Sequence, residues 1–303
     1  MKILIKRVQN DACISAAERE KFGTQFKKYM FMAVAGMLAL SSCSSDDNDV
    51  QDVQNAPRQM TFTAGYNDDG TTRATLDGST KKVSFDAGDK IGIISTNNPN
   101  VQFTTSAGGA SATFTGTATD DAKFYAVYPY TEGLTLVGNV IKVILIPTNQ
   151  WNSNWESDEV EYSGWDPKAP VAYATTTGSS LQFHNLCAIL KLTFPSVDTF
   201  GWFTISANEP LAGAFDLDTS TGTLTPNPGS NTVAVGAIWD KEICTDYVGK
   251  TVYVAIAPGT YTGFNLHLYN EDDDDKTILK SGSVTFEAGK IYDLGTFRFD
   301  NLG

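Results

Sequence analysis

The sequence has little histidine and few charged residues. Of its 303 residues, two are His and 19% are charged, and the formal net charge at pH 7 is −13. A negatively charged surface repels phosphate groups, so we expect no nucleic-acid partner. The two histidines, His184 and His267, lie in separate strand-like runs with no neighbouring cysteine or second histidine. Neither run therefore carries a local motif for metal binding or acid–base catalysis.

Motifs for catalysis and cofactor binding are also missing. The sequence contains no Gly-x-Ser-x-Gly nucleophile elbow, no phosphate-binding Gly-Lys-Ser/Thr loop and no dinucleotide-binding glycine pattern. Asp216 and Asp218 begin a loop that lacks the spacing and terminal Glu of a calcium loop, and Asn270–Asp275 is an acidic run. We interpret both segments as hairpin turns. We expect no enzyme activity, no metal site and no cofactor.

No apolar run reaches the roughly 20 residues needed to cross a bilayer. The longest, Met30–Leu40, follows Lys27 and Lys28 and ends in small residues before Cys43, a pattern typical of a secretory signal. Leu-Ser-Ser-Cys resembles a bacterial lipobox, in which cleavage between Ser42 and Cys43 leaves Cys43 as the lipidated first residue. The acidic run after it resembles the tag that directs lipoproteins of Bacteroidota to the cell surface. The prediction is a surface-exposed lipoprotein anchored in the outer membrane.

Two cysteines remain beyond the lipidation site, since Cys13 lies in the leader. Cys187 and Cys244 could form a disulfide in an exported protein. Cys187 also fits a second interpretation, because it lies in an apolar run where a free thiol packs as a small hydrophobic side chain. Both alternatives stay open.

Beyond the leader the sequence predicts strands and no helices. Short runs of Val, Ile, Thr, Phe and Tyr alternate with Gly, Asn, Asp, Ser and Pro. Strands are expected at 59–64, 82–85, 90–95, 101–105, 112–117, 123–128, 139–146, 172–177, 181–194 (broken near Asn185), 202–207, 211–217, 232–235, 251–256, 261–269, 277–281 and 291–299. An all-β chain must pair its sheets to bury their apolar faces. We expect a signal peptide at 1–42, an acidic tether at 43–58, and β-sandwich domains at 59–195 and 196–303.

An ordered set of motifs resembles the fimbrillin-like (Mfa-like, type V pilin) lipoproteins of Bacteroidota. The matching segments are Thr71–Thr75, Val83–Gly92, Phe124–Tyr130, Leu181–Leu192, Pro210–Gly213 and Val254–Tyr261. The resemblance implies two tandem transthyretin-like β-sandwiches in a subunit of surface fimbriae that acts in adhesion. It also implies that an arginine-specific protease cuts between Arg73 and Ala74. The first strand then leaves, and a strand of another fimbrial subunit replaces it.

The sequence offers one further region for binding. Trp151, Trp155, Tyr162 and Trp165 lie among polar residues in an expected long loop, and such rings can stack on a host or bacterial surface glycan or contact a protein. They can equally pack on one another to order the loop. The alternative function is therefore a monomeric glycan-binding surface lipoprotein of a carbohydrate-uptake system.

Overall fold

The computed structural model describes residues 56–66, 84–147, 166, 168–194, 200–235, 250–270, 275–279 and 282–297. All of them belong to one compact unit, Gln51–Gly303. Their regular elements are β-strands, which confirms the predicted all-β class. Within these ranges no helix has the length and apolar character required of a membrane span.

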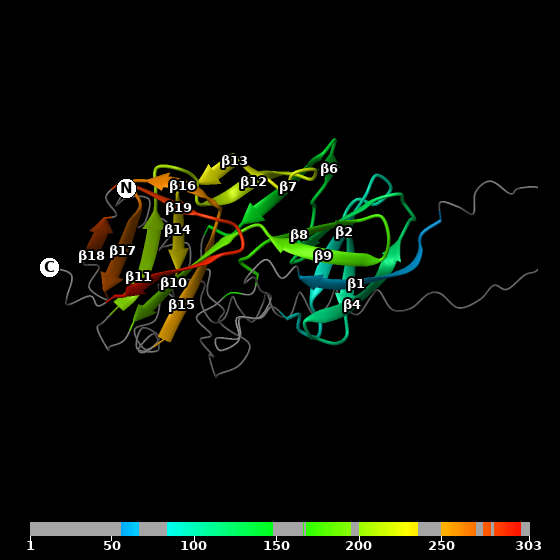
Figure 1. Cartoon of the computed structure of the whole chain (residues 1–303), viewed down its shortest axis with the longest axis horizontal. Coiled ribbons are helices and arrows are strands. Elements are labelled where there is room, and N and C mark those ends of the chain that lie inside the picture. Colours follow the sequence, from blue (N-terminus) through cyan, green and yellow to red (C-terminus); the bar gives the residue numbers. More distant parts are fainter. Residues whose placement is uncertain are drawn as a thin grey trace, which may run out of the picture. The chain divides into compact units, whose positions relative to one another are not determined.

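Seven strands form a closed barrel (Figure 1). They are β1 (Arg58–Tyr66), β2 (Lys90–Ile94), β3 (Val101–Thr105), β4 (Ser111–Ala118), β5 (Phe124–Tyr128), β8 (Ala172–Thr176) and β9 (Ser180–Asn185). Their order around the ring is β1-β4-β3-β2-β5-β8-β9. The ring closes through β1, which pairs antiparallel with β4 and parallel with β9. The sequence predicted a sandwich of two sheets for this half, and in the structure the strands pair all the way round into one closed barrel.

The barrel encloses a core rich in aromatic rings. Its largest fully buried side chains are Phe62, Phe85, Phe103, Phe114, Phe183, Ile91 and Ile93. Those in strands occupy alternate positions, since successive residues of a strand point to opposite faces, and Phe85 lies before β2 in an isolated bridge with Gly109. β4 shows this plainly, because Ala112 and Phe114 are buried and Thr113 and Thr115 are exposed.

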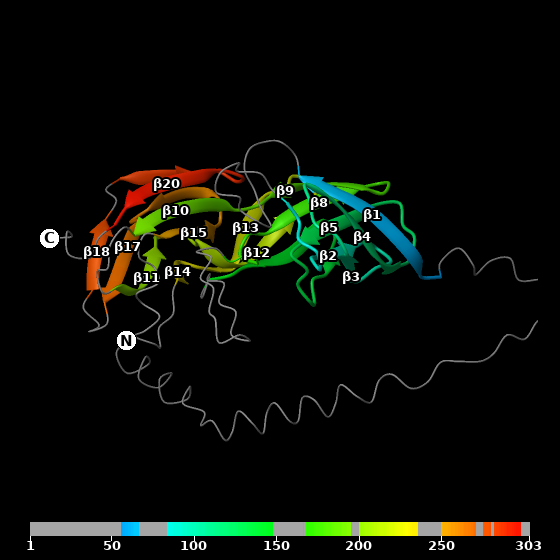
Figure 2. The same cartoon turned by 90° about the horizontal axis from the view of Figure 1, so that it is seen from below.

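The other strands form four sheets. Their members are β6 (Leu136–Val137), β7 (Val140–Leu145), β10 (Ala188–Phe194), β11 (Phe200–Ser206), β12 (Ala212–Asp218), β13 (Leu224–Ser230), β14 (Thr232–Val235), β15 (Lys250–Ile256), β16 (Gly259–Thr262), β17 (Asn265–Asn270), β18 (Asp275–Leu279), β19 (Ser283–Phe286) and β20 (Ile291–Thr296). The sheet orders are β15-β10-β20, β14-β11-β17-β18, β13-β12-β7-β6 and β16-β19. Figure 2 shows β10 beside β15 and β20. β7 and β10 precede residue 195 and pair with strands that follow it, so the sheets cross the boundary predicted there.

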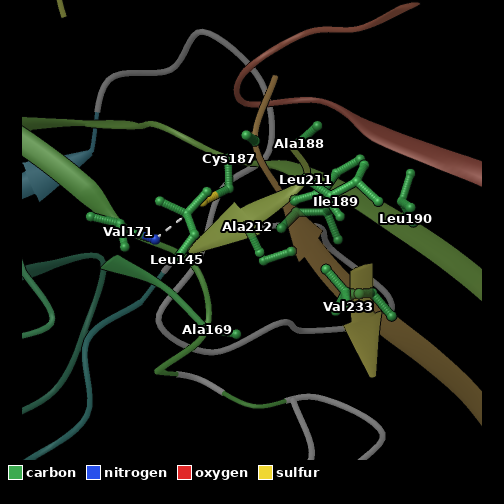
Figure 3. Close-up of a cluster of buried hydrophobic side chains, with 14 of the residues drawn as sticks. Leu145, Ala169, Val171, Cys187, Ala188, Ile189, Leu190, Leu211, Ala212 and Val233 are labelled. Carbon is green, nitrogen blue, oxygen red and sulfur yellow. Dashed lines mark hydrogen bonds between the residues drawn. The ribbon is translucent and has the colours of Figure 1, made fainter. Parts of the chain in front are cut away.

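A second core cluster fills the space between these sheets, and Cys187 lies within it. The thiol is fully buried and free, beside Leu145, Ala188 and Leu211 (Figure 3). The backbone N–H of Val171 donates a 3.3 Å hydrogen bond to the sulfur. Burial raises the pKa of the Cys187 thiol to about 12. Cys187 therefore packs as a small apolar side chain, and Cys244 lies outside the described residues.

Most predicted strands match those of the structure, with two corrections. The strand predicted at 261–269 is two strands, β16 and β17, which belong to different sheets, and in the described part of 82–85 Phe85 forms only an isolated bridge with Gly109. β13 was missed because Pro226 and Pro228 lie within it. Proline lacks the N–H of a ladder and is confined to edge strands, and β13 is the outermost strand of its sheet. The two acidic segments are hairpins as predicted: β12 pairs with β13 across the first, and β17 with β18 across the second.

Candidate functional site

The candidate site is the groove of the barrel that β1 fills. β1 pairs with β4 along almost its whole length, from Arg58 opposite Ala118 to Gly65 opposite Ser111. On its other side it pairs with β9 only from Thr63 to Tyr66. In Figure 1 β1, drawn in blue, lies beside β4 and β9. β1 is thus the N-terminal strand of the ring, and its pairing with β4 on one side and β9 on the other closes the barrel.

Alternate side chains of β1 point into the barrel. Phe62 and Ala64 are buried, whereas Gln59, Thr61 and Thr63 are exposed. Phe62 meets Phe103 and Phe124 edge to face, with ring centroids 5.4 and 5.3 Å apart. Such pairs add roughly 0.5–1.5 kcal/mol each to the contribution of area burial. β1 is therefore part of the barrel core as well as of its ladder.

The C-terminal end of β1 lies near a small cluster of polar side chains, Tyr66, Tyr128 and Asp89. Tyr66 stacks on Phe85 with centroids 5.1 Å apart, and its hydroxyl is buried without a hydrogen-bond partner. The Tyr128 hydroxyl donates a 3.3 Å hydrogen bond to Oδ2 of Asp89. The same oxygen accepts a 2.8 Å hydrogen bond from the backbone N–H of Asp86. These groups come from β1, β5 and the turn before β2.

Burial controls the ionisation of this group. It raises the pKa of Asp89, against the lowering effect of the Asp86 N–H, and the negative charge of Asp86 raises it further. Burial also raises the pKa of Tyr66 and of Tyr128, and the Asp89 carboxylate adds to both shifts. Both phenols are neutral at physiological pH. This group was not predicted from the sequence, although Phe62-x-Ala64-x-Tyr66 and Phe124-x-Ala126-x-Tyr128 share one pattern that points to its two tyrosines.

The N-terminal end of β1 is held at the surface. Arg58 forms a 2.6 Å ion pair with Asp120, and both side chains are more than half exposed. Exposed pairs of this kind contribute little, about 0–1 kcal/mol. The backbone of Arg58 nonetheless lies in the β1–β4 ladder, opposite Ala118.

Most of the residues singled out in the sequence lie outside the described residues. This holds for Ser42, Cys43, Arg73, Ala74, Trp151, Trp155, Tyr162 and Trp165. The chain segment that carries Arg73 joins the end of β1 at Tyr66 to Ser84. The roles assigned to these residues stay predictions.

The two histidines are strand residues. His267 is half-buried on the face of β17 opposite Leu266 and Leu268, as its alternation predicts. Its ring nitrogens lie 3.4 Å from Ser206 Oγ and 2.8 Å from Thr277 Oγ1. His184 is exposed on β9. In the part of the chain that the structure describes, no group of three or more His, Cys, Asp or Glu side chains is arranged to hold a metal ion.

Comparisons with known proteins gave matches only among solved structures. No protein-family model matches the sequence, and no curated protein matches it. A proposed cell adhesion protein from Bacteroides uniformis matches with a TM-score of 0.47 and 18% identity over 78% of this chain and 92% of its own. One from Bacteroides ovatus has a TM-score of 0.47 and 13% identity over 79% and 92%. The tip fimbrial protein Mfa3 from Porphyromonas gingivalis, truncated at its C-terminus, has a TM-score of 0.32 and 8% identity over 80% and 96%. At such values a likeness does not establish a shared function.

Proposed function

We propose that this chain is a fimbrillin-like, lipid-anchored subunit of surface fimbriae that acts in adhesion and has no catalytic role. It consists of two tandem transthyretin-like domains and assembles by strand exchange after an arginine-specific protease cuts between Arg73 and Ala74. The observation that carries the proposal is the place of β1, which is the N-terminal strand of the barrel and pairs with both strands that flank the groove.

The position of Arg73 makes β1 separable. Because β1 ends at Tyr66 and the barrel resumes at Ser84, a cut after Arg73 removes the covalent link between them. Cys43 precedes this cut, so the lipid anchor leaves with the same fragment. Arg58 is the other arginine between the leader and Arg298, and a cut there would leave β1 attached. Its place in the β1–β4 ladder protects it, since a protease needs an unpaired extended segment.

After β1 has left, the binding of a new strand in the groove is more favourable than exposure of the groove to solvent. Loss of β1 would expose the buried surroundings of Phe62 and Ala64 and leave unpaired backbone groups on β4 and β9. A strand from another subunit restores both the ladder hydrogen bonds and the side-chain contacts. The partners implied are other fimbrial subunits, the protease, the outer membrane through the lipid, and a surface glycan or protein as receptor.

The test uses the chain from Ser44 to Gly303, which lacks the leader and the lipidated cysteine. An arginine-specific protease is added briefly, and the products are identified by intact mass. A fluorescent peptide with the sequence of residues 58–66 then reports whether the groove accepts a strand. We expect one cut, after Arg73, and peptide binding only to the cut protein.

Two variants serve as a matched pair. Arg73→Ala should stay intact and bind no peptide, whereas Arg58→Ala should be cut and bind peptide like the wild type. Resistance of the wild type at Arg73, or a cut protein that does not take up the peptide, would contradict the proposed function. Either result would favour the monomeric glycan-binding lipoprotein, which needs no strand release.

A further inference from the structure

The groove that β1 fills is selective, and its selectivity identifies the kind of strand that can replace β1. We propose that it accepts a strand with the pattern apolar-x-aromatic-x-small-x-aromatic. We propose further that a different subunit supplies this strand and that β20 of a second copy of this chain does not. This inference rests on the strand-exchange function proposed above. We name the positions that Met60, Phe62, Ala64 and Tyr66 occupy subsites 1 to 4, in that order.

Subsite 2 requires an aromatic ring. Phe62 is 1% exposed and contacts Phe103 and Phe124 edge to face from two sides. Phe114 lies directly opposite on β4 and is itself fully buried. A smaller side chain would leave a cavity here, and a charged one would lose its hydration without gaining a partner of opposite charge.

Subsite 3 admits only a small side chain. Ala64 is 0% exposed and lies between Ala112 on β4 and Leu181 on β9, both of which are buried. Because β1 pairs with β4 and β9 on both sides at this level, neither neighbour can move away without breaking a ladder. A branched or aromatic side chain at subsite 3 would therefore overpack the barrel.

Subsite 4 is an aromatic slot, and subsite 1 is less demanding. The Tyr66 ring lies against Phe85 and Phe183, with centroids 5.1 and 5.8 Å apart. Its hydroxyl makes no hydrogen bond among the described residues, so phenylalanine meets the same need. Met60 is partly buried opposite Gly116, where an unbranched apolar side chain fits.

The direction of the incoming strand is also set. To restore both ladders it must run antiparallel to β4 and parallel to β9, as β1 does. The side chains between the subsites, such as Thr61 and Thr63, are exposed and place no demand on the partner.

The last strand of this chain does not fit these subsites. Ile291–Phe299, the strand expected from sequence, contains three seven-residue windows. These windows place the following residues at subsites 1 to 4: Ile291, Asp293, Gly295 and Phe297; Tyr292, Leu294, Thr296 and Arg298; Asp293, Gly295, Phe297 and Phe299. The first puts a carboxylate in aromatic subsite 2, the second a guanidinium in aromatic subsite 4, and the third a phenylalanine in small subsite 3.

β20 is also engaged within its own chain. It pairs in parallel with β10, and Asp293 forms a 2.6 Å ion pair with Lys191 across that pairing. Copies of this chain should therefore not extend one another through β20. The incoming strand is therefore expected from a segment other than β20, and we infer that a different subunit supplies it.

The experiment measures the affinity of four fluorescent peptides for the protein after cleavage at Arg73. They are residues 58–66, the same peptide with Ala64→Leu, the same peptide with Thr63→Leu, and residues 291–299. Both single changes place a leucine in the strand, one at subsite 3 and one at the adjacent outward position. We expect Thr63→Leu to bind within threefold of the parent, Ala64→Leu to bind at least tenfold more weakly, and residues 291–299 not to bind. Gel filtration should show the cut protein alone as a monomer.

The outcomes separate the two proposals. If no peptide binds, including the parent, strand release itself fails and the proposed function fails with it. If the parent binds but Ala64→Leu binds equally well, the groove is not selective and this inference is wrong although strand exchange stands. Binding of residues 291–299, or multimers of the cut protein alone, would overturn the exclusion of a second copy as donor.

Discussion

Phe62 on β1 and Phe124 on β5 meet edge to face inside the barrel, with ring centroids 5.3 Å apart and ring planes at 69°. β1 and β5 are not neighbours in the ring, because three strands separate them on one side and two on the other. The contact therefore crosses the barrel interior. Release of β1 must disrupt the core as well as two ladders, which makes the intact chain resistant to spontaneous exchange.

Replacement of Phe62 by Ala tests this coupling. Truncation of a fully buried aromatic side chain leaves a cavity, and we expect a loss of about 3–5 kcal/mol in the free energy of unfolding. Thr63→Ala is the matched control, since Thr63 is the next residue of the strand and is exposed. Urea denaturation should show a change of less than about 0.5 kcal/mol for the control. Equal effects of the two changes would contradict the inward placement of Phe62.

The unpaired hydroxyl of Tyr66 gives a second prediction. Because a buried hydroxyl without a partner opposes folding, Tyr66→Phe should leave stability unchanged or raise it by about 1 kcal/mol. Tyr128→Phe removes a hydroxyl that donates to Asp89 and should lower stability by about 0.5–1.5 kcal/mol. Thermal unfolding of both variants provides the comparison. A marked loss in Tyr66→Phe would show that this hydroxyl has a partner.

Asp89 should make stability depend on pH in the direction opposite to most carboxylates. Burial raises its pKa in the folded state above the ordinary 3.8, so the folded state binds more protons than the unfolded state in that interval. Its contribution to the free energy of unfolding is then fully present below the ordinary pKa and is lost as pH rises through the raised value. Urea unfolding of the wild type and of Asp89→Asn from pH 4 to 7 isolates this contribution.

The wild type should lose stability relative to Asp89→Asn as pH increases over that range. Asp86, Tyr66 and Tyr128 are the other titratable groups near Asp89, and the two phenols stay neutral throughout. A difference between the two proteins that does not change with pH would contradict the raised pKa.

Gly116 on β4 provides a test of packing next to subsite 1. A Cβ at this position would lie 2.6 Å from the Phe103 ring and 2.9 Å from the backbone oxygen of Gln102. Gly116→Ala should therefore destabilise the barrel by about 1–3 kcal/mol. At Gly178 the nearest atom to an added Cβ is 4.0 Å away, and Gly178→Ala should be tolerated. Thermal unfolding distinguishes the two, and equal melting temperatures would rule out the tight contact.

The alternation of side chains predicted which face of each strand is buried, and the structure confirms it for β1 and β4. It could not predict strand partners, because period-two alternation fixes a face and not a neighbour. The parallel pairing of Thr63–Tyr66 with β9 joins segments more than a hundred residues apart and has no local signal. The group of Tyr66, Asp89 and Tyr128 comes from three separate segments, and the spacing shared by Phe62–Tyr66 and Phe124–Tyr128 was the one local sign of its two tyrosines.

The central claim is that β1 must leave before another strand can enter, and a reversible lock tests it most directly. Thr61 on β1 lies opposite Thr115 on β4, and both are exposed. The backbone N–H of Thr63 donates a hydrogen bond to the carbonyl of Ser179, so the backbone polar groups of Thr63 point away from β4. Those of Thr61, two residues earlier, point the same way. Thr61 and Thr115 therefore form a non-hydrogen-bonded pair, in which opposite side chains lie closest. A disulfide between Thr61→Cys and Thr115→Cys fits this spacing.

The measurement is uptake of the fluorescent peptide 58–66 by this double variant after cleavage at Arg73, first oxidised and then reduced. The account predicts no uptake while the disulfide holds β1 against β4, and wild-type uptake once it is reduced. Uptake by the oxidised, cut protein at the wild-type rate would contradict the account, because the groove would then accept a strand while β1 is still in place.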